Sequence, residues 1–137
     1  MPSKTSASAQ SVSAPASRAP RSAKPVARFR MRINAGDAIA IGPGKISLLE
    51  AIEETGSITA AAKHLDMSYR RAWLLLDELN RSLRKPAVDS AKGGTHGGGS
   101  EVTAVGRQLI ALYRSVEATA SKACQADIAQ LIALLAR

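Results

Sequence analysis

The fold is decided by the stretch SITAAAKHLDMSYRRAW, residues 57–73. Ser57 is a preferred helix-capping residue, and the alanine run that follows it favours a short helix with a small surface. The pair Asp66-Met67 predicts a tight turn, after which Ser68 caps a second helix. The sequence therefore predicts two helices joined by a tight turn, a helix-turn-helix.

The elements around this stretch extend the pattern. Apolar residues before it recur at helical spacing and predict a first helix that ends at Gly56. The second helix of the turn is predicted over Ser68 to Ser82, with Pro86 stopping it. Its inner side is formed by Ala72, Leu75, Leu76, Leu79 and Leu83. A glycine-rich loop follows between two short predicted strands, 87–90 and 101–103, which together are typical of a wing.

Both ends of the chain carry further signals. Residues 27–34 alternate apolar and basic side chains and predict a strand, which Gly36-Asp37 would turn back into a second strand at 38–41. From residue 104 onward there is no proline, and an apolar stripe predicts one long C-terminal helix over 104–137. Little chain remains to cover that stripe, so we expect the protein to be a homodimer whose two copies pack together through this helix.

The net charge of +8 is unevenly distributed. Residues 1–36 hold seven basic and no acidic residues, whereas residues 37–137 hold twelve basic and eleven acidic ones. Residues 1–25 are rich in Ser, Ala and Pro, and we expect a disordered basic tail there. The folded DNA-binding domain is expected over 26–120. Its function has to be inferred from the arrangement of charges rather than from their total.

The start of the second helix carries that arrangement. In a helix-turn-helix this end enters the major groove, where Arg pairs with guanine and Ser or Tyr holds phosphate. The wing would contact the DNA backbone through its loop. The residues expected to contact DNA are Ser57, Thr59, Ser68, Tyr69, Arg70, Arg71, Lys92, Thr95 and His96.

Other classes of site find no support. No nucleophile, base and orienting acid converge in the sequence, so no enzyme is predicted. The single cysteine, Cys124, and two histidines lack metal-site spacing, and no phosphate-loop motif occurs, so no cofactor is expected. Trp73 is interpreted as a core residue. No apolar run reaches the length of a membrane span, and we expect a cytoplasmic protein.

The segments ISLLEAI from Ile46, GSITAAA from Gly56, SYRRAW from Ser68 and GGTHGGG from Gly93 together resemble a known family. They are similar to the N-terminal DNA-binding domain of the ModE molybdate-responsive regulators, which are related to LysR-type winged helices. The resemblance covers about residues 27–120. It implies a mainly helical winged helix-turn-helix with a small β-hairpin wing, and a bacterial homodimer on double-stranded DNA.

The resemblance stops where ModE proteins continue into molybdate-binding domains, since nothing similar follows here. We therefore expect a standalone transcriptional regulator of molybdenum- or metal-related genes, acting without its own sensor or with one on a separate protein. Two alternatives stay open. One is a winged-helix protein–protein interaction module, and the other is a nonspecific architectural DNA binder that depends on the basic tail.

Overall fold

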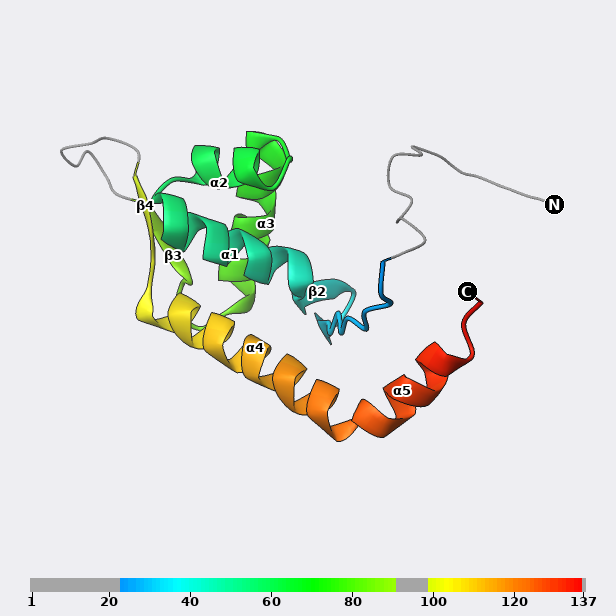
Figure 1. Cartoon of the computed structure of the whole chain (residues 1–137). Helices are drawn as coiled ribbons and strands as arrows, with labels where there is room; N and C mark the ends of the chain where they lie inside the picture. Colours follow the sequence, from blue (N-terminus) through cyan, green and yellow to red (C-terminus); the bar gives the residue numbers. More distant parts are fainter. Residues whose placement is uncertain (1–22, 91–98, 137) are drawn as a thin grey trace. The chain divides into compact units, whose positions relative to one another are not determined.

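A computed structural model describes residues 23–90 and 99–136 of the 137-residue chain. Two strands, three helices, two more strands and two final helices follow one another along the chain (Figure 1). Residues 28–125 form one compact unit, which holds the helix-turn-helix. Most of the last helix belongs to a second compact unit. No helix among the described residues is both long and apolar enough to cross a membrane.

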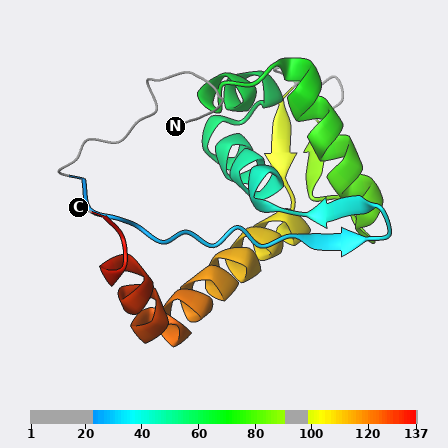
Figure 2. The same ribbon diagram turned by 90° about the vertical axis from the view of Figure 1, so that its right-hand side faces the viewer.

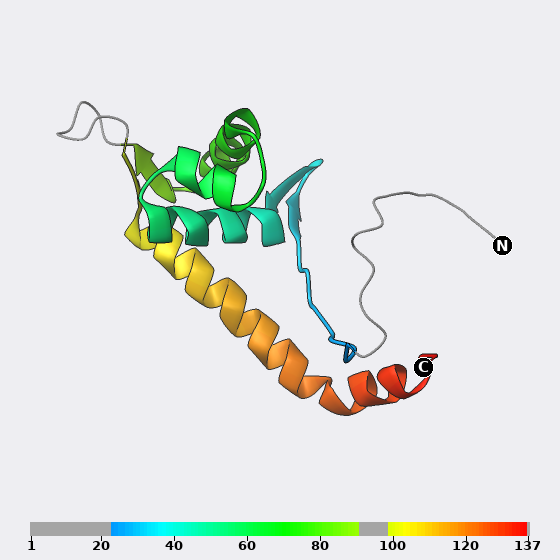
Figure 3. The ribbon, with the colours of Figure 1, turned by 45° about the horizontal axis from the view of Figure 1, so that its top comes forward.

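Helix α1 (Pro43–Thr55) is the centre of the larger unit. It lies between α4 on one side and α2 with α3 on the other (Figures 1 and 3). Because it is covered on several sides, its apolar residues are not confined to one stripe, as expected for a central helix. Its buried apolar residues are Ile46, Leu48, Leu49, Ala51 and Ile52. Gly56 ends the helix with a left-handed backbone (φ 79°), which confirms its predicted role.

Helices α2 (Ile58–His64) and α3 (Tyr69–Ser82) form the predicted pair. Ala61, Ala62 and Ala72 are almost completely buried, and their small side chains let α2 and α3 approach α1 closely. Leu76 and Leu79 complete the buried side of α3. The helix ends at Ser82, four residues before Pro86, so the proline follows the end of the helix rather than causing it.

The predicted strand over 27–34 is mostly wrong. Strand β1 covers only Ile33–Ala35 and pairs antiparallel with β2 (Ala38–Ile41), and this hairpin lies beside α3 (Figure 2). Residues 28–32 do alternate, with Phe29 and Met31 half-buried and the arginines exposed, but they form no strand. The physical reason is that β2 is only four residues long, so residues before Ile33 have no backbone partner.

The wing strands are β3 (Val88–Ser90), which begins one residue later than predicted, and β4 (Ser100–Val102), which is shifted by one residue toward the N-terminus. They pair antiparallel, with Val88 opposite Val102. The Ser100 N–H donates to the Gly56 carbonyl at 3.1 Å, which fixes β4 to the end of α1. The wing and the β1–β2 hairpin therefore lie at opposite ends of α1 (Figure 3).

The expected single helix over 104–137 is instead two helices, α4 (Ala104–Ala123) and α5 (Gln125–Ala133), interrupted at Cys124. Neither proline nor glycine causes the interruption. Thr119 and Ser121 are weak helix formers, and Asp127 favours a new helix start in the first turn of α5. No side chain after Tyr113 in α4 is buried, so packing does not hold the helix together there.

Candidate nucleic-acid interface

The turn between α2 and α3 is fixed by two caps and one unusual backbone angle. The Ser57 Oγ accepts from the Ala60 N–H at 2.9 Å, and the Ser68 Oγ accepts from the Arg71 N–H at 3.1 Å. Between them Asp66 adopts a left-handed φ of 57°, and the Met67 N–H donates to the Ala62 carbonyl at 2.9 Å. These bonds confirm both predicted caps and set where α3 begins.

The first turn of α3 presents the side chains that the sequence singled out. Tyr69 is 54% exposed, and Arg70 and Arg71 are both exposed. Neither arginine forms a salt bridge with any acidic side chain in residues 23–90 and 99–136. Ser68, Arg70 and Arg71 line one shallow depression together with Leu74, Leu75 and Glu78.

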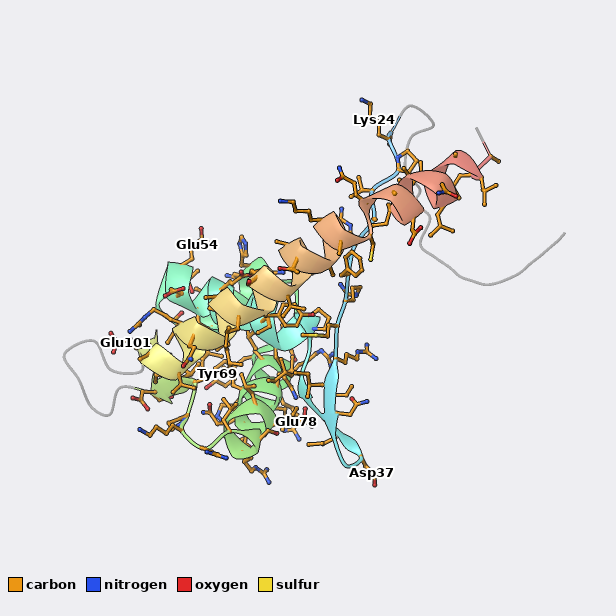
Figure 4. All side chains as sticks on the ribbon, turned by 90° about the horizontal axis from the view of Figure 1, so that it is seen from below. Lys24, Asp37, Glu54, Tyr69, Glu78 and Glu101 are labelled. Atoms are coloured by element: carbon orange, nitrogen blue, oxygen red, sulfur yellow. The ribbon has the colours of Figure 1, made fainter. Side chains whose placement is uncertain are left out.

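Charge is polarised along α3. Its first turn holds two arginines and no acid, whereas its second half holds two acidic residues, Asp77 and Glu78, and one basic residue, Arg81. Figure 4 shows Glu78 on α3 and places another carboxylate, Asp37, at the tip of the β1–β2 hairpin. Because carboxylates repel phosphate, the N-terminal half of α3 is the part suited to contact a polyanion.

An ion pair between a buried lysine and a half-exposed glutamate, which the sequence did not reveal, joins α3 to α1. Lys45 of α1 is only 4% exposed, and its Nζ lies 2.7 Å from Glu78 Oε1. The same ammonium donates to the Ile39 carbonyl of β2. Lys45 therefore links α1, α3 and the hairpin at one point, and no local sequence pattern announces such a contact between distant elements.

The base of the wing is also fixed to α3. The Asn80 side chain accepts from the Ala87 N–H at 2.8 Å and donates to the Val88 carbonyl at 3.3 Å. On the other side, the Thr103 hydroxyl donates to the Pro86 carbonyl at 2.7 Å and caps α4 through the Gly106 N–H. The wing strands therefore keep a set position relative to α3.

The remaining residues predicted to contact DNA differ in their exposure to solvent. Thr59 is exposed at the start of α2, while Ser57 is half-buried, with its hydroxyl engaged in the cap. Lys92, Thr95 and His96 lie outside the described residues. The interpretation of Trp73 as a core residue is wrong, because its side chain is 47% exposed. It follows Arg70 by three positions and so lies on the outer side of α3.

Helix α4 closes the unit on the far side of α1. The Tyr113 hydroxyl donates to the Met31 carbonyl at 2.8 Å, and burial raises the pKa of this phenol. Farther along, Leu112 and Val116 are 57% and 45% exposed and lie one helical turn apart. The described residues contain no group of three His, Cys, Asp or Glu side chains arranged for a metal ion.

Sequence comparisons identify relatives of part of the chain. No protein-family model matches it. It is 41% identical over 88 residues to the molybdenum transport protein ModE of Azotobacter vinelandii, which is 64% of this chain and 33% of that protein. It is 43% identical over 82 residues, 60% of this chain, to 30% of the molybdenum-pterin-binding protein MopB of Rhodobacter capsulatus.

A third relative is the DNA-binding transcriptional dual regulator ModE of Escherichia coli K12, 42% identical over 71 residues, or 52% of this chain and 27% of that protein. The chain thus spans about a third of the length of the curated relatives it matches.

Among solved structures, the DNA-binding domain in the CbnR–DNA complex aligns with a TM-score of 0.51 at 22% identity. That alignment covers 64% of this chain and 95% of the other. The fold is therefore the predicted winged helix-turn-helix, mainly helical with a small wing, and the homologues of the chain are the ModE and Mop proteins.

Proposed function

We propose that this protein is a sequence-specific, DNA-binding transcriptional regulator. In this proposal α3 enters the major groove by its N-terminal half, and Ser68, Tyr69, Arg70 and Arg71 contact bases and phosphates. The observation that carries the proposal is the pair of exposed arginines on the first turn of a capped helix, beside a wing whose base is fixed.

These arginines stand where basic residues destabilise a helix. The N-terminus of a helix carries partial positive charge, so acidic residues stabilise it and basic residues do not. The first turn of α3 nevertheless holds Arg70 and Arg71 and no acid. Residues that break a local rule in this way are expected at functional sites. A bound phosphate would relieve the repulsion.

The wing completes the proposed contact. Lys92, Thr95 and His96 belong to the loop between β3 and β4, and we assign them to the DNA backbone. The names of the relatives concern molybdenum transport and molybdenum-pterin binding. Genes for molybdenum, or for another metal, are accordingly the proposed targets.

We propose a homodimer that forms through α4. Leu112 and Val116 make an apolar strip that no other part of residues 28–125 buries. Two copies related by a two-fold axis would place two α3 helices on successive major grooves, about 34 Å apart. Leu112→Asp with Val116→Asp should convert the dimer into a monomer in analytical ultracentrifugation. A wild-type chain that sediments as a monomer at micromolar concentration contradicts this part.

The DNA proposal is tested by two charge-matched variants. Random-sequence DNA is selected with the purified wild-type chain, and binding to the enriched sequence is measured by fluorescence anisotropy. Arg70→Ala with Arg71→Ala should lose at least 100-fold in affinity for that sequence, about 1–3 kcal/mol for each lost base contact. Arg84→Ala with Lys85→Ala removes the same charge after the end of α3, and should cost about tenfold or less on all sequences alike.

The other readings predict different results. A protein–protein interaction module shows no salt-sensitive DNA binding by the wild-type chain. An architectural binder binds without enriching a sequence and loses most of its affinity when residues 1–25 are deleted. Equal losses in both double variants would mean that net charge, rather than the position of Arg70 and Arg71, determines binding.

A further inference from the structure

Apolar side chains share the outer side of α3 with its arginines. Trp73 and Leu74 are 47% and 48% exposed, and they follow Arg70 by three and four positions. In a helix these spacings place them on the same face as Arg70, one turn farther along. The proposed DNA-contacting face therefore continues from a cationic turn into an apolar one.

The surroundings of Leu74 do not form a core. The depression that it lines is bordered by Ser68, Arg70, Arg71 and Glu78, with only Leu75 as an apolar neighbour. Trp73 borders a second hollow, between α3 and β3, which is lined by Ile58, Leu76 and Val88 as well as by Asp77, Asn80 and Ser90. The exposed half of each side chain gains little from the folded chain itself, so a bound partner is where it would contribute.

The charge around these side chains favours one partner. Arg70 and Arg71 lie one turn away and form no salt bridge with the described residues. An apolar protein surface would have to desolvate these two charges, whereas a polyanion neutralises them. In the major groove of DNA the apolar group on a base edge is the 5-methyl of thymine, and apolar side chains are what recognise it.

We infer that Leu74 and Trp73 read thymine through its 5-methyl group, one helical turn beyond the base that Arg70 contacts. This inference rests on the proposed function and adds its specificity-determining residues. An arginine on one turn and apolar side chains on the next would select a guanine and a thymine at neighbouring positions of each half-site.

The test removes methyl groups from DNA without changing base pairing. In the sequence enriched by the wild-type chain, each thymine is replaced in turn by deoxyuridine, and affinity is measured by fluorescence anisotropy. At one or two positions in each half-site the wild-type chain should lose about fourfold, the contribution of one buried methyl-sized group.

Leu74→Ala and Trp73→Ala identify the side chains responsible. Each variant should bind thymine and deoxyuridine equally well at one of the sensitive positions. Val26→Ala also removes an exposed apolar side chain but lies outside α3, and should keep the fourfold preference. Circular dichroism checks that the variants keep their helices, which is expected because both truncated side chains are half-exposed.

The outcomes separate this inference from the function on which it rests. If no sequence is enriched, both are overturned. If a sequence is enriched but every deoxyuridine substitution changes affinity by less than twofold, sequence-specific binding stands and thymine reading is overturned. A fourfold preference that survives in both the Leu74 and the Trp73 variant also overturns it, because the methyl groups would then contact other residues.

Discussion

Arg114 of α4 and Glu50 of α1 form a bidentate ion pair. The Arg114 Nε donates to Glu50 Oε2 at 2.9 Å, and its Nη2 donates to Oε1 at 2.6 Å. The remaining nitrogen, Nη1, donates to Glu117 Oε1 at 2.7 Å, which orients the guanidinium along its own helix. The pair joins α4, the proposed dimer helix, to α1, against which α3 is held.

This pair should contribute a measurable but modest coupling energy. Its two side chains are 41% and 39% exposed, so water screens the attraction, while the two parallel hydrogen bonds favour the upper part of the range for exposed pairs. A double-mutant cycle of Glu50→Ala and Arg114→Ala in urea unfolding should give about 0.5–1 kcal/mol. Additive single effects would show that the pair contributes nothing to stability.

The same pair predicts a dependence of stability on acid. Hydrogen bonds from Arg114 lower the pKa of Glu50 below its ordinary value of 4.5, with burial opposing the shift. A carboxyl whose folded pKa is lowered stabilises the fold fully above its unfolded pKa, and this stabilisation is lost as the pH falls through the folded pKa. The coupling measured at pH 7 should therefore disappear in acid, once the pH falls below the lowered folded pKa of Glu50.

A matched variant isolates this carboxyl. Glu50→Gln should flatten part of the decline in unfolding free energy between pH 5 and pH 3, whereas Glu54→Gln, an exposed residue at the end of the same helix, should leave the decline as it is in the wild type. Equal curves for Glu50→Gln and the wild type would contradict the assignment.

The features that the sequence predicted correctly depend on neighbouring residues. Ser57 and Ser68 cap helices through backbone groups three positions away, and Gly56 ends α1 by its own backbone angle. Such signals are local, so they can be read from the chain. The exposed positions of Arg70 and Arg71 followed from the caps, because the caps fix where the first turn of α3 begins.

The errors concern features that depend on partners far away in the sequence. The alternation over 27–34 matches the half-buried Phe29 and Met31 but not Ile33, which is 47% exposed. Pairing into a strand needs a second backbone, which β2 supplies only from Ile33 onward. The interruption at Cys124 occurs where no buried side chain holds the helix together. The contacts of Lys45 with Glu78 and of Arg114 with Glu50 join separate elements, so no periodicity could reveal them.

Tyr113 should stabilise the fold through its hydroxyl. Tyr113→Phe removes the bond to the Met31 carbonyl and should lower the unfolding free energy by about 0.5–1.5 kcal/mol at pH 7. Tyr69→Phe removes the same atom from an exposed side chain and should change stability by less than about 0.5 kcal/mol. Urea unfolding of the two variants side by side measures the difference, and equal effects would contradict it.

Alkaline pH should remove part of the stability that depends on Tyr113. Burial raises the pKa of Tyr113 above the ordinary 10.0, so the folded chain holds this proton more tightly than the unfolded one. The resulting stabilisation is complete below the unfolded pKa and is lost as the pH rises through the folded pKa. The Tyr113→Phe variant should accordingly show a shallower loss of stability above pH 10 than the wild type, measured by thermal melts.

Asn80 should be needed to hold the wing against α3. Asn80→Ala leaves the Ala87 N–H and the Val88 carbonyl without their side-chain partner, and both residues are buried. Buried groups that lose their partners cost about 1–3 kcal/mol. Ser82→Ala, an exposed change on the same helix, should cost less than about 0.5 kcal/mol. Faster amide exchange in β3 of the Asn80 variant alone would place the effect at the wing.

Two glycines in helices should respond in opposite ways to alanine. At Gly44 of α1 an added Cβ meets nothing within 4 Å, so Gly44→Ala should stabilise the chain by about 0.4–1 kcal/mol through the unfolded state. At Gly106 of α4 the same atom would overlap the Ala87 carbonyl oxygen and the Val102 side chain. Backbone cannot move aside as a flexible side chain can, so Gly106→Ala should destabilise by about 1–3 kcal/mol. The measurement is urea unfolding of both variants. Stabilisation by Gly106→Ala would show that the base of the wing can separate from α4, and the fixed wing position on which the proposed DNA contact depends would then be wrong.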